Sequence, residues 1–483
     1  MLRFFREKAA VFVWVIVIAF VLTLFAGAYL SKFSGGESSS VDVRSEAVAR
    51  FGDYSVSEQQ YRQFLSQQLG GYVVDGKLKV SPDVIELLQY QVLIKLLQDE
   101  VFYQAAVSKK IKVTKRDWAQ AFQELIMYYD LKDKKALKSF LKEQGRSFSS
   151  FKKELKRTIL ARKFTMFLQA PVSLDKQDIE QSFRSLKLRY LYVNPKKGAD
   201  VSKQIQDLSD RLKSGMLFSE VDSFFSDEEA FVKVSSESNW IGYGELPFSV
   251  QKVAYVLDKN EVSQPISYGD AYFIVQSLDS KRIPAPKDYE ESSYKDQLTS
   301  ALKSRALSQY VSFFLLENPL QIQDMTLQAI DAKKRRDFDS AIAAYRLLSS
   351  QQVSNPMPHY FLGKLYLGIQ DYDNAKDELL KAEVKVGLLK GFQFPELFFV
   401  LGQYFEIMKD SRSSLDYYRK ALSFSEYRLD LLEPLKEKFS QLKRQPEVQQ
   451  IQKYIRQLEE KKDKKVTVQS GSLEKDTKKH KLK

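Results

Sequence analysis

The sequence predicts a mainly helical protein of several domains, with one small domain that combines helices and strands. Apolar residues recur at helical spacing through most of the first 185 residues and again after residue 284. Between these two regions, residues 188–193 alternate in the manner of a strand. The last third repeats with a period of 34 residues, which is typical of a solenoid of paired helices. A length of 483 residues is enough for about three ordinary domains.

The composition excludes several kinds of active site. The chain has no cysteine, which removes disulfides, thiolate metal sites and cysteine nucleophiles. It has only two histidines, His359 and His480, so we expect no metal site, no cofactor and no histidine proton relay. The positive charge exceeds the negative by 13, which favours an anionic partner. Because the sequence contains no phosphate-binding loop and no basic–aromatic motif, we do not expect that partner to be nucleic acid.

Residues 1–32 predict a short cytoplasmic tip and a transmembrane anchor. Ala9–Leu30 are 22 positions without a charge, and a helix of that length spans a hydrocarbon core of about 30 Å. Arg3, Arg6 and Lys8 precede it, which leaves the N-terminus in the cytoplasm and the rest of the chain across the membrane. The alternative is a cleaved signal peptide, because Ala26–Ala28 has the small-residue pattern of a cleavage site. Both interpretations export the rest of the chain.

Residues 33–185 predict a polar linker, one short strand at 47–51 and then helices. Ser57, with Gln60 three positions later, has the arrangement of a capping box at a helix start. Further helix starts are expected at Ser81-Pro82 and at Thr114, and a fourth apolar stripe runs through 148–167. The simplest interpretation of each apolar stripe is that it packs into the hydrophobic core. Their total apolar area also suits a protein that binds unfolded chains.

Residues 186–283 predict the small α+β domain. Leu188–Val193 reads as its first strand, 201–214 as a helix and Ala271–Asp279 as its last strand. After a Pro-Ala-Pro break at 284–286, residues 284–317 return to a helical pattern.

Residues 318–460 predict the repeat array. Ala341, Ala375 and Ser414 occupy equivalent positions, 34 and then 39 residues apart, and we explain the difference by an insertion near 387–394. This pattern resembles tetratricopeptide repeats, whose concave face binds peptides or partner proteins. We expect 427–458 to form terminal capping helices and His359 to be structural. The tail 461–483 has nine lysines and is expected to be disordered, with anionic lipid or an acidic protein as its alternative partner.

The N-terminal order resembles SurA-like folding factors and, more closely, the membrane-anchored PpiD-like folding factors of the periplasm. A basic tip and a single anchor lead to the Ser57 opening, a long helix ending in Val101–Ala106, and the segment Lys110–Thr114. This resemblance implies a helical chaperone region at 33–185 that binds unfolded or extended polypeptides. It also implies that the helix in 284–317 packs back onto the N-terminal helices.

Residues 186–283 resemble the parvulin prolyl isomerases. Phe218–Asp227 is similar to the parvulin pattern of Phe, three later Leu, and a Ser-Asp turn. Trp240–Gly244 lies where parvulins have a Gly-rich loop. Val253–Ile266 is similar to their helix, turn and strand, and Ala271–Asp279 to their final strand. The resemblance covers about 95 residues and implies a parvulin-like fold.

The resemblance also implies that the parvulin catalytic chemistry has been lost. Parvulins place two histidines and an Asp or Cys at positions that correspond to Tyr190, Phe273 and Trp240. Phe273 cannot form a conventional hydrogen bond, and Trp240 can only donate one. The pocket phenylalanine corresponds to Val250, with Phe248 as a possible substitute. We therefore predict no catalytic residues and little or no isomerase activity, so that enzymatic function is uncertain and expected to be absent.

The aromatic residues of this domain are candidates for binding extended peptide. They are Trp240, Tyr243, Phe248 and Phe273. The alternative is that these rings only fill the space of the former pocket.

Together these features predict a chaperone tethered to the inner membrane, with its bulk in the periplasm. It would hold unfolded exported polypeptides, and its repeats would bind a protein partner. Tethering raises the local concentration of clients, so weak contacts suffice. Two alternatives remain open: an active prolyl isomerase with a non-standard site, and an assembly scaffold that holds no clients.

Overall fold

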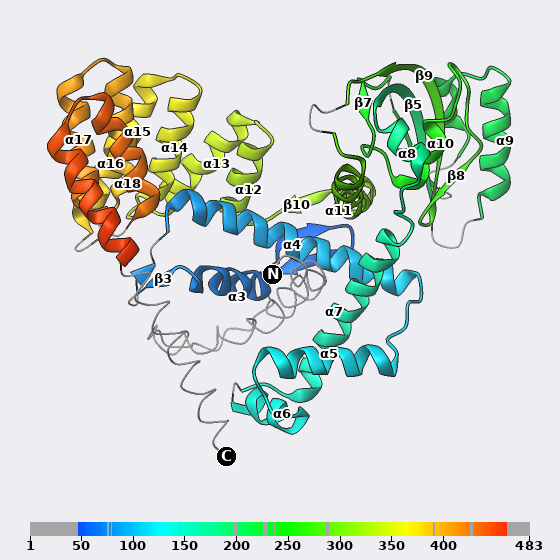
Figure 1. Cartoon of the computed structure of the whole chain (residues 1–483), viewed down its shortest axis with the longest axis horizontal. Coiled ribbons are helices and arrows are strands. Elements are labelled where there is room, and N and C mark those ends of the chain that lie inside the picture. Colours follow the sequence, from blue (N-terminus) through cyan, green and yellow to red (C-terminus); the bar gives the residue numbers. More distant parts are fainter. Residues whose placement is uncertain are drawn as a thin grey trace. The chain divides into compact units, whose positions relative to one another are not determined.

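The computed structural model describes residues 47–460, except 75–76, 79, 144, 197–199, 226–229, 236, 286–288, 390–391 and 426–427. The predicted anchor at 9–30 and the lysine-rich tail therefore lie outside the described residues. None of the helices in the described ranges is long and apolar enough to cross a bilayer. Helices dominate the structure, and a small antiparallel sheet domain stands among them, which confirms the predicted mainly helical class with one small α+β domain (Figure 1).

The described residues form two compact units. The first comprises 50–55 and 95–321, and the second comprises 47–49, 56–94 and 322–460. The helix α4, Pro82–Ser108, contributes its first half to the second unit and its second half to the first. A three-stranded sheet has the order β10-β1-β2, with bounds Leu320–Ile322, Ala47–Phe51 and Tyr54–Ser57.

The helices α5, α6 and α7 form a small lobe of the first unit. Their bounds are Lys115–Tyr128, Lys134–Glu143 and Phe148–Gln169. Thr114 begins α5 with a capping box, in which its hydroxyl accepts from the Asp117 amide and the Asp117 carboxylate accepts from the Thr114 amide. The predicted start is thereby confirmed, whereas α6 was not predicted. Leu125, Leu137 and Phe151 are fully buried at the centre of the lobe.

The α+β domain contains a five-stranded antiparallel sheet. Its order is β6-β5-β9-β8, with β7 paired to β5 (Figure 1). The strands are β5 Arg184–Pro195, β6 Ala230–Val234, β7 Ile241–Gly242, β8 Ile266–Tyr268 and β9 Ala271–Arg282. The helices are α8 Lys176–Gln181, α9 Ser202–Lys213, the short helix η1 Phe218–Ser223, and α10 Phe248–Ala254. Thus α10 begins five residues before Val253, the first residue of the segment matched to the parvulin helix, turn and strand.

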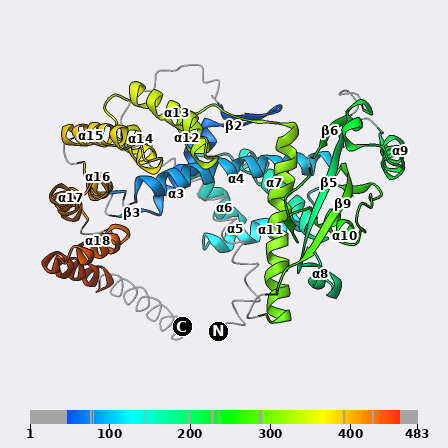
Figure 2. The same cartoon turned by 90° about the horizontal axis from the view of Figure 1, so that it is seen from above.

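Period-two alternation separates the two faces of this sheet. Leu191 and Ile274 point to one face, where α9 and η1 cover them. Tyr192 and Phe273 point to the other face, where α10 and α11 contribute to the same apolar cluster. The helix α11, Glu291–Glu317, runs beside the sheet (Figure 2).

The helix α11 also packs against α7, as the resemblance implies. The ring of Tyr310 lies 4.9 Å from that of Phe164, centroid to centroid. The Gln169 side chain donates to the Lys303 carbonyl at 3.3 Å. Its extensive contact with the sheet was not predicted from the sequence.

The second unit begins with α3, Glu58–Gly70, which Ser57 caps by accepting from the Gln60 amide. The short strands β3, Val73–Val74, and β4, Lys77–Leu78, form a hairpin, and the first half of α4 follows. The Tyr61 hydroxyl donates to the Gln89 carbonyl at 3.3 Å, which ties α3 to α4.

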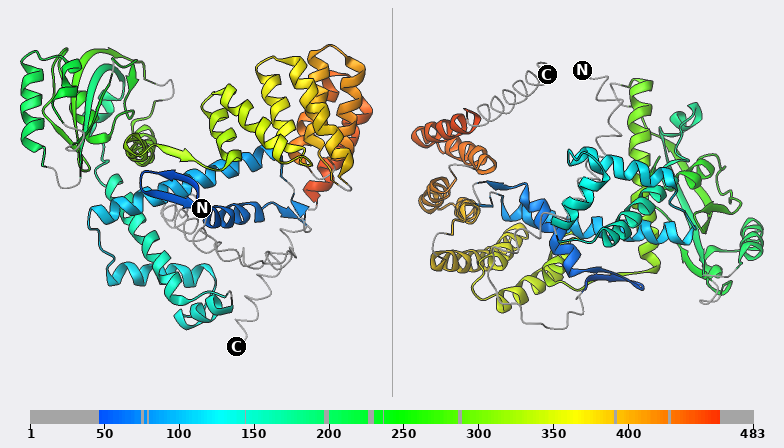
Figure 3. Two further views of the ribbon diagram at one scale, coloured as in Figure 1. Left: turned by 180° about the vertical axis from the view of Figure 1, so that it is seen from behind. Right: turned by 90° about the horizontal axis from the view of Figure 1, so that it is seen from below.

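The rest of the second unit is a row of helix pairs that is consistent with an α-solenoid (Figure 3). The pairs are α12 Met325–Lys334 with α13 Phe338–Gln351, α14 Met357–Gly368 with α15 Tyr372–Leu388, and α16 Pro395–Ile407 with α17 Ser411–Ser423. Then come α18, Leu429–Gln441, and a helical segment at 445–460.

The turns within the pairs repeat with the predicted spacing. Arg336, Gln370, Lys409 and Lys443 all have positive φ, at intervals of 34, 39 and 34 residues. In the first three turns, the next residue is an aspartate whose side chain caps the second helix of the pair. The turn at Lys443 joins α18 to 445–460. The segment expected to be a cap therefore has the helix–turn–helix form of a fourth pair.

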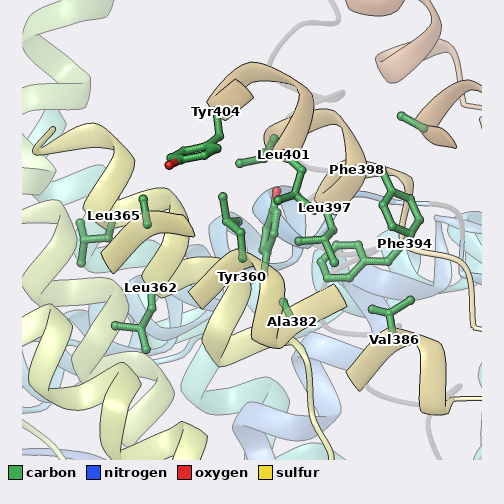
Figure 4. Packing of buried hydrophobic residues seen from close by; sticks show 14 of the residues in the cluster. Tyr360, Leu362, Leu365, Ala382, Val386, Phe394, Leu397, Phe398, Leu401 and Tyr404 are labelled. Carbon is green, nitrogen blue, oxygen red and sulfur yellow. The ribbon is translucent and has the colours of Figure 1, made fainter. Parts of the chain in front are cut away.

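Small residues let the paired helices approach closely. A Cβ atom on Gly363 of α14 would lie 2.5 Å from the Leu379 side chain, and one on Gly402 of α16 would lie 2.5 Å from the Tyr418 ring. Large buried side chains such as Tyr360, Phe394 and Leu401 fill the space between the helices (Figure 4). His359 is 9% exposed, and its Nδ1 lies 2.6 Å from the Glu378 carboxylate, which fits the structural role expected for it.

Candidate functional site

The face of the sheet that carries Tyr190 and Phe273 is the candidate site. Tyr192 lies opposite Phe273 in the β5–β9 register, and Tyr190 lies two residues earlier on the same face. The ring centroids of Tyr190 and Phe273 are 5.8 Å apart, so the structure brings these two predicted positions together. Phe273 is fully buried and Tyr190 is half-buried.

The α11 side chain of Phe313 covers this face. Its ring centroid lies 4.9 Å from that of Tyr192, with the rings stacked, and 5.1 Å from that of Phe273, with the rings edge to face. It also meets the Tyr268 ring at 5.8 Å. Phe273 has no exposed surface in this arrangement, so a peptide cannot reach it while these rings stay packed.

The Gly-rich loop is held against the same helix. Gly244 has a φ of +96°, which favours glycine, and a Cβ atom there would lie 2.8 Å from both Leu302 and Arg305 of α11. Its amide donates to the buried side chain of Gln251 at 2.6 Å, and its carbonyl accepts from Gln309 at 3.1 Å. These contacts leave no room for a substrate backbone beside Gly244.

Tyr243 is part of a buried polar network. Its hydroxyl donates to the Asp178 carboxylate at 2.7 Å, and Lys252 donates to the other oxygen of that carboxylate at 2.9 Å. Burial raises the pKa of Tyr243, and its hydrogen bond to Asp178 raises it further. The phenol therefore stays protonated and serves as a donor to Asp178.

Trp240 and Phe248 are more accessible than the other two peptide-binding candidates. Trp240 is 37% exposed, and the ammonium of Lys281 lies 4.4 Å from its ring centroid. Phe248 is half-buried, and the Lys252 ammonium lies 5.8 Å from its ring centroid. The structure places Tyr243, Phe273 and Val250 in one apolar cluster, with Phe248 packed against it. Trp240 instead lies beneath the Lys281 side chain.

A small cavity lies between the sheet and the end of α11. Its volume is about 60 Å³, far below the several hundred Å³ of a typical ligand site. The Glu317 carboxylate accepts from the Tyr192 hydroxyl at 2.9 Å and from the Asn194 side chain at 2.7 and 2.8 Å. Burial raises the pKa of Glu317 above its ordinary value, although the bonds from Asn194 and Tyr192 lower it. The lining residues are Tyr192, Asn194, Tyr268, Asp270, Ala271, Tyr310, Phe313, Phe314 and Glu317.

The raised pKa of Glu317 predicts a pH dependence of stability. The folded chain binds this proton more tightly than the unfolded chain, whose carboxyl has a pKa of 4.5. We therefore expect the stabilisation to be fully present below pH 4.5 and to fall as the pH rises through the folded-state pKa. The measurement is urea unfolding of the wild type and of Glu317→Gln between about pH 4 and pH 8. The free energy of unfolding of the wild type minus that of the variant reports the titration of Glu317. The prediction is contradicted if the free energy of unfolding of the wild type, relative to that of Glu317→Gln, stays constant or rises with pH.

The residues of α11 are the part of this site that the sequence did not reveal. The alternation of Tyr190 and Tyr192 was a usable signal for placing Tyr192 on this face. Phe313 and Glu317 carry no such signal, because their partners on the sheet are 40 or more residues away in the sequence.

The positions aligned with the parvulin polar groups carry aromatic rings in this structure. Rotation about an imide bond must overcome a barrier of about 18–20 kcal/mol, and parvulins lower it with polar groups around the twisted bond. Here the corresponding positions carry a phenol, a phenyl ring and an indole. Within the described ranges, no group of three or more His, Cys, Asp or Glu side chains is placed to hold a metal ion.

Known proteins match both regions of the first two thirds of the chain. Residues 1–165 match the SurA-like N-terminal domain, and residues 188–279 match the PPIC-type peptidyl-prolyl isomerase domain. Foldase protein PrsA 4 of Bacillus cereus is 22% identical over 279 residues, which are 57% of this chain and 85% of that protein.

Solved structures of the same group align over similar lengths at low identity. The peptidylprolyl isomerase PrsA of Bacillus anthracis is 15% identical, with a TM-score of 0.20, over 47% of this chain and 96% of the other. A structure from work on PEB4 and Cj1289, two SurA-like chaperones of Campylobacter jejuni, is 10% identical, with a TM-score of 0.22. The match covers 57% of this chain and 98% of the other. Residues 1–165 are thus similar to the SurA-like N-terminal domain, residues 188–279 are similar to the PPIC-type parvulin domain, and the two lie in the order SurA-like domain, then parvulin domain.

Proposed function

We propose that the protein is a membrane-tethered periplasmic chaperone. Its parvulin domain holds extended polypeptide or has a structural role, and it does not isomerise prolyl bonds. The observation that carries the proposal is the covered, imidazole-free face around Phe273. Both histidines of the chain lie outside this domain, and Phe313 lies against Phe273, one of the positions where the resemblance expects a histidine. The uncharged segment at 9–30 supports tethering and export.

Client holding is assigned to residues 33–185, which we call the SurA-like region because the match to the SurA-like N-terminal domain covers most of them. Several large apolar side chains of this region are exposed, among them Met127 at 72%, Met166 at 56% and Phe167 at 51%. Methionine adapts its shape to varied partners, which suits a surface that binds many sequences. Because each such contact is weak, tethering near the site of translocation raises the effective concentration of clients.

The C-terminal helix pairs are assigned to tetratricopeptide repeats that bind a protein partner. The intervals of 34, 39 and 34 residues between equivalent turns support this assignment, as do Gly363 and Gly402 at equivalent helix contacts.

Two assays on the full chain test the proposal. With a prolyl peptide, we expect cis–trans exchange at the uncatalysed rate, because no side chain at Tyr190, Trp240 or Phe273 provides the polar set of a parvulin. With an unfolded exported protein, we expect suppression of aggregation at near-stoichiometric amounts. A strong isomerase rate would overturn the inactive assignment. Failure to suppress aggregation would favour the scaffold alternative.

A matched pair of variants locates the holding surface. Met127→Ser combined with Phe167→Ser is expected to weaken the suppression several-fold, since it removes exposed apolar area from the SurA-like region. Val384→Ser combined with Leu388→Ser removes two apolar side chains, 65% and 77% exposed, from the repeat array and is expected to have no effect. Equal effects of the two changes would contradict the assignment to the SurA-like region.

A further inference from the structure

The first two turns of α4 are bound by the repeat array through two carboxylates, those of Asp83 and Glu86. Glu86 is 5% exposed and accepts hydrogen bonds from two repeat helices. One oxygen accepts from the Lys333 ammonium of α12, and the other accepts from the Tyr345 hydroxyl of α13. A carboxylate buried to this extent is stable only with such partners.

The second carboxylate belongs to Asp83, three residues earlier on the same face of the helix. It accepts from the Lys364 ammonium and, at 3.1 Å, from the Tyr360 hydroxyl, both of α14. We call Lys333, Tyr345, Tyr360 and Lys364 the carboxylate site. One ammonium and one phenol of this site meet each carboxylate.

The carboxylate site is built into the core of the array. Tyr345 and Tyr360 are each 1% exposed, and the Tyr345 ring stacks on Phe361 with centroids 5.6 Å apart. The Lys333 ammonium lies 5.2 Å from the Phe361 ring centroid. Burial raises the pKa of both phenols, and the facing carboxylates raise it further, so both remain donors. Two buried phenol donors flanked by two ammonium groups require an acidic ligand, because a buried donor without an acceptor is costly.

The polar contacts between α4 and the carboxylate site are of a kind that an external ligand can replace. The cluster of buried apolar side chains that forms the core of the array has no member from α4 in the described ranges. The side chains of Asp83 and Lys364 are 43% and 34% exposed, so their ion pair is weakened by salt. A second polar contact follows one turn later, where the Tyr90 hydroxyl donates to Asp331 at 3.1 Å. At Asp83, Glu86 and Tyr90 the array is therefore met by charged and hydroxyl groups, whereas Leu88 and Val92 on the same helix are buried.

We propose that the carboxylate site is a receptor for an acidic helix and that the chain occupies it with its own α4. The ligand class is a helical segment with two carboxylates three residues apart. An external segment of this class binds when the first two turns of α4 have left the site. This inference rests on the proposed partner-binding role of the repeats, and it makes α4 an internal competitor for that partner.

The test uses the full chain and a fluorescent peptide that contains residues 81–94. The double variant Asp83→Lys, Glu86→Lys places ammonium groups against Lys333 and Lys364 and so vacates the site. We expect this variant to bind the peptide at least ten-fold more tightly than the wild type does, in fluorescence anisotropy at low salt. Adding Lys333→Met and Lys364→Met is expected to abolish the gain. The control peptide carries Asn and Gln in place of the two acids and is expected not to bind.

Equal binding of the peptide to the wild type and the double variant overturns the proposal, as does equal binding of the control peptide. If the double variant unfolds, the fourfold exchange that adds Lys333→Glu and Lys364→Glu provides the second test. It restores both ion pairs with reversed charge, so we expect it to recover most of the lost melting temperature. No recovery contradicts the proposal. The aggregation assay above is read separately, so failure of client holding and failure of this site are distinguishable.

Discussion

Replacing Phe313 with alanine is expected to destabilise the contact between α11 and the parvulin sheet by about 3 kcal/mol, the usual cost of removing a packed phenylalanine. The ring lies against Tyr192 and Phe273 at centroid distances of 4.9 and 5.1 Å, and it also meets Tyr268. Its removal leaves a cavity between α11 and the sheet. Hydrogen exchange of the β5 and β9 amides in the full chain measures the effect locally.

Leu316→Ala is the matched control on the same helix. Leu316 is 42% exposed, so its truncation is expected to change protection by less than about 0.5 kcal/mol. If Phe313→Ala and Leu316→Ala behaved alike, α11 would not be the cover of this face. We expect no isomerase activity in Phe313→Ala, because uncovering Phe273 does not provide an imidazole.

The second large effect is expected for Gly363→Ala in α14. The added Cβ would lie 2.5 and 2.7 Å from side-chain carbons of Leu379 and 3.2 Å from its backbone nitrogen. Leu379 is fully buried in the core of the array and cannot withdraw. We expect a loss of about 2–3 kcal/mol from overpacking, measured by thermal or urea unfolding followed by helical circular dichroism.

Gly368→Ala tests the same substitution near the end of the same helix. No atom lies within 4 Å of a Cβ placed there, so the gain in helix propensity is expected to dominate and to stabilise the chain by up to about 1 kcal/mol. The free energy of unfolding is expected to fall for Gly363→Ala and to rise for Gly368→Ala. These opposite signs separate the effect of close packing from that of helix propensity. A destabilising Gly368→Ala, or a neutral Gly363→Ala, would contradict this account.

Several elements could be predicted from the sequence because their causes are local. The capping residues Ser57 and Thr114 begin helices where the sequence places them. Alternation in 188–193 predicts a strand, and the spacing of Ala341 and Ala375 predicts the repeat. The helix α6 was missed, because its short basic sequence has a narrow apolar face that includes Leu137 and Leu141.

The candidate site was predictable only in part. The resemblance to parvulins placed Tyr190 and Phe273 together, and the register of β5 and β9 does bring them into contact. It did not indicate that Tyr243 donates to a buried aspartate or that Trp240 lies under a lysine. Those environments depend on Asp178 and Lys281, which belong to other elements.

By itself the sequence determined which chemistry is absent from the parvulin domain, because a chain with two histidines elsewhere cannot provide an imidazole there. It also determined the helical and repeating character of the chain, since periodicity is a property of neighbouring residues. Only the tertiary structure decided that Phe313 covers Phe273 and that Glu86 lies against Lys333 and Tyr345. These pairs are separated by 40 to more than 250 residues. Contacts at such separations follow from how whole elements pack, and local sequence patterns do not encode them.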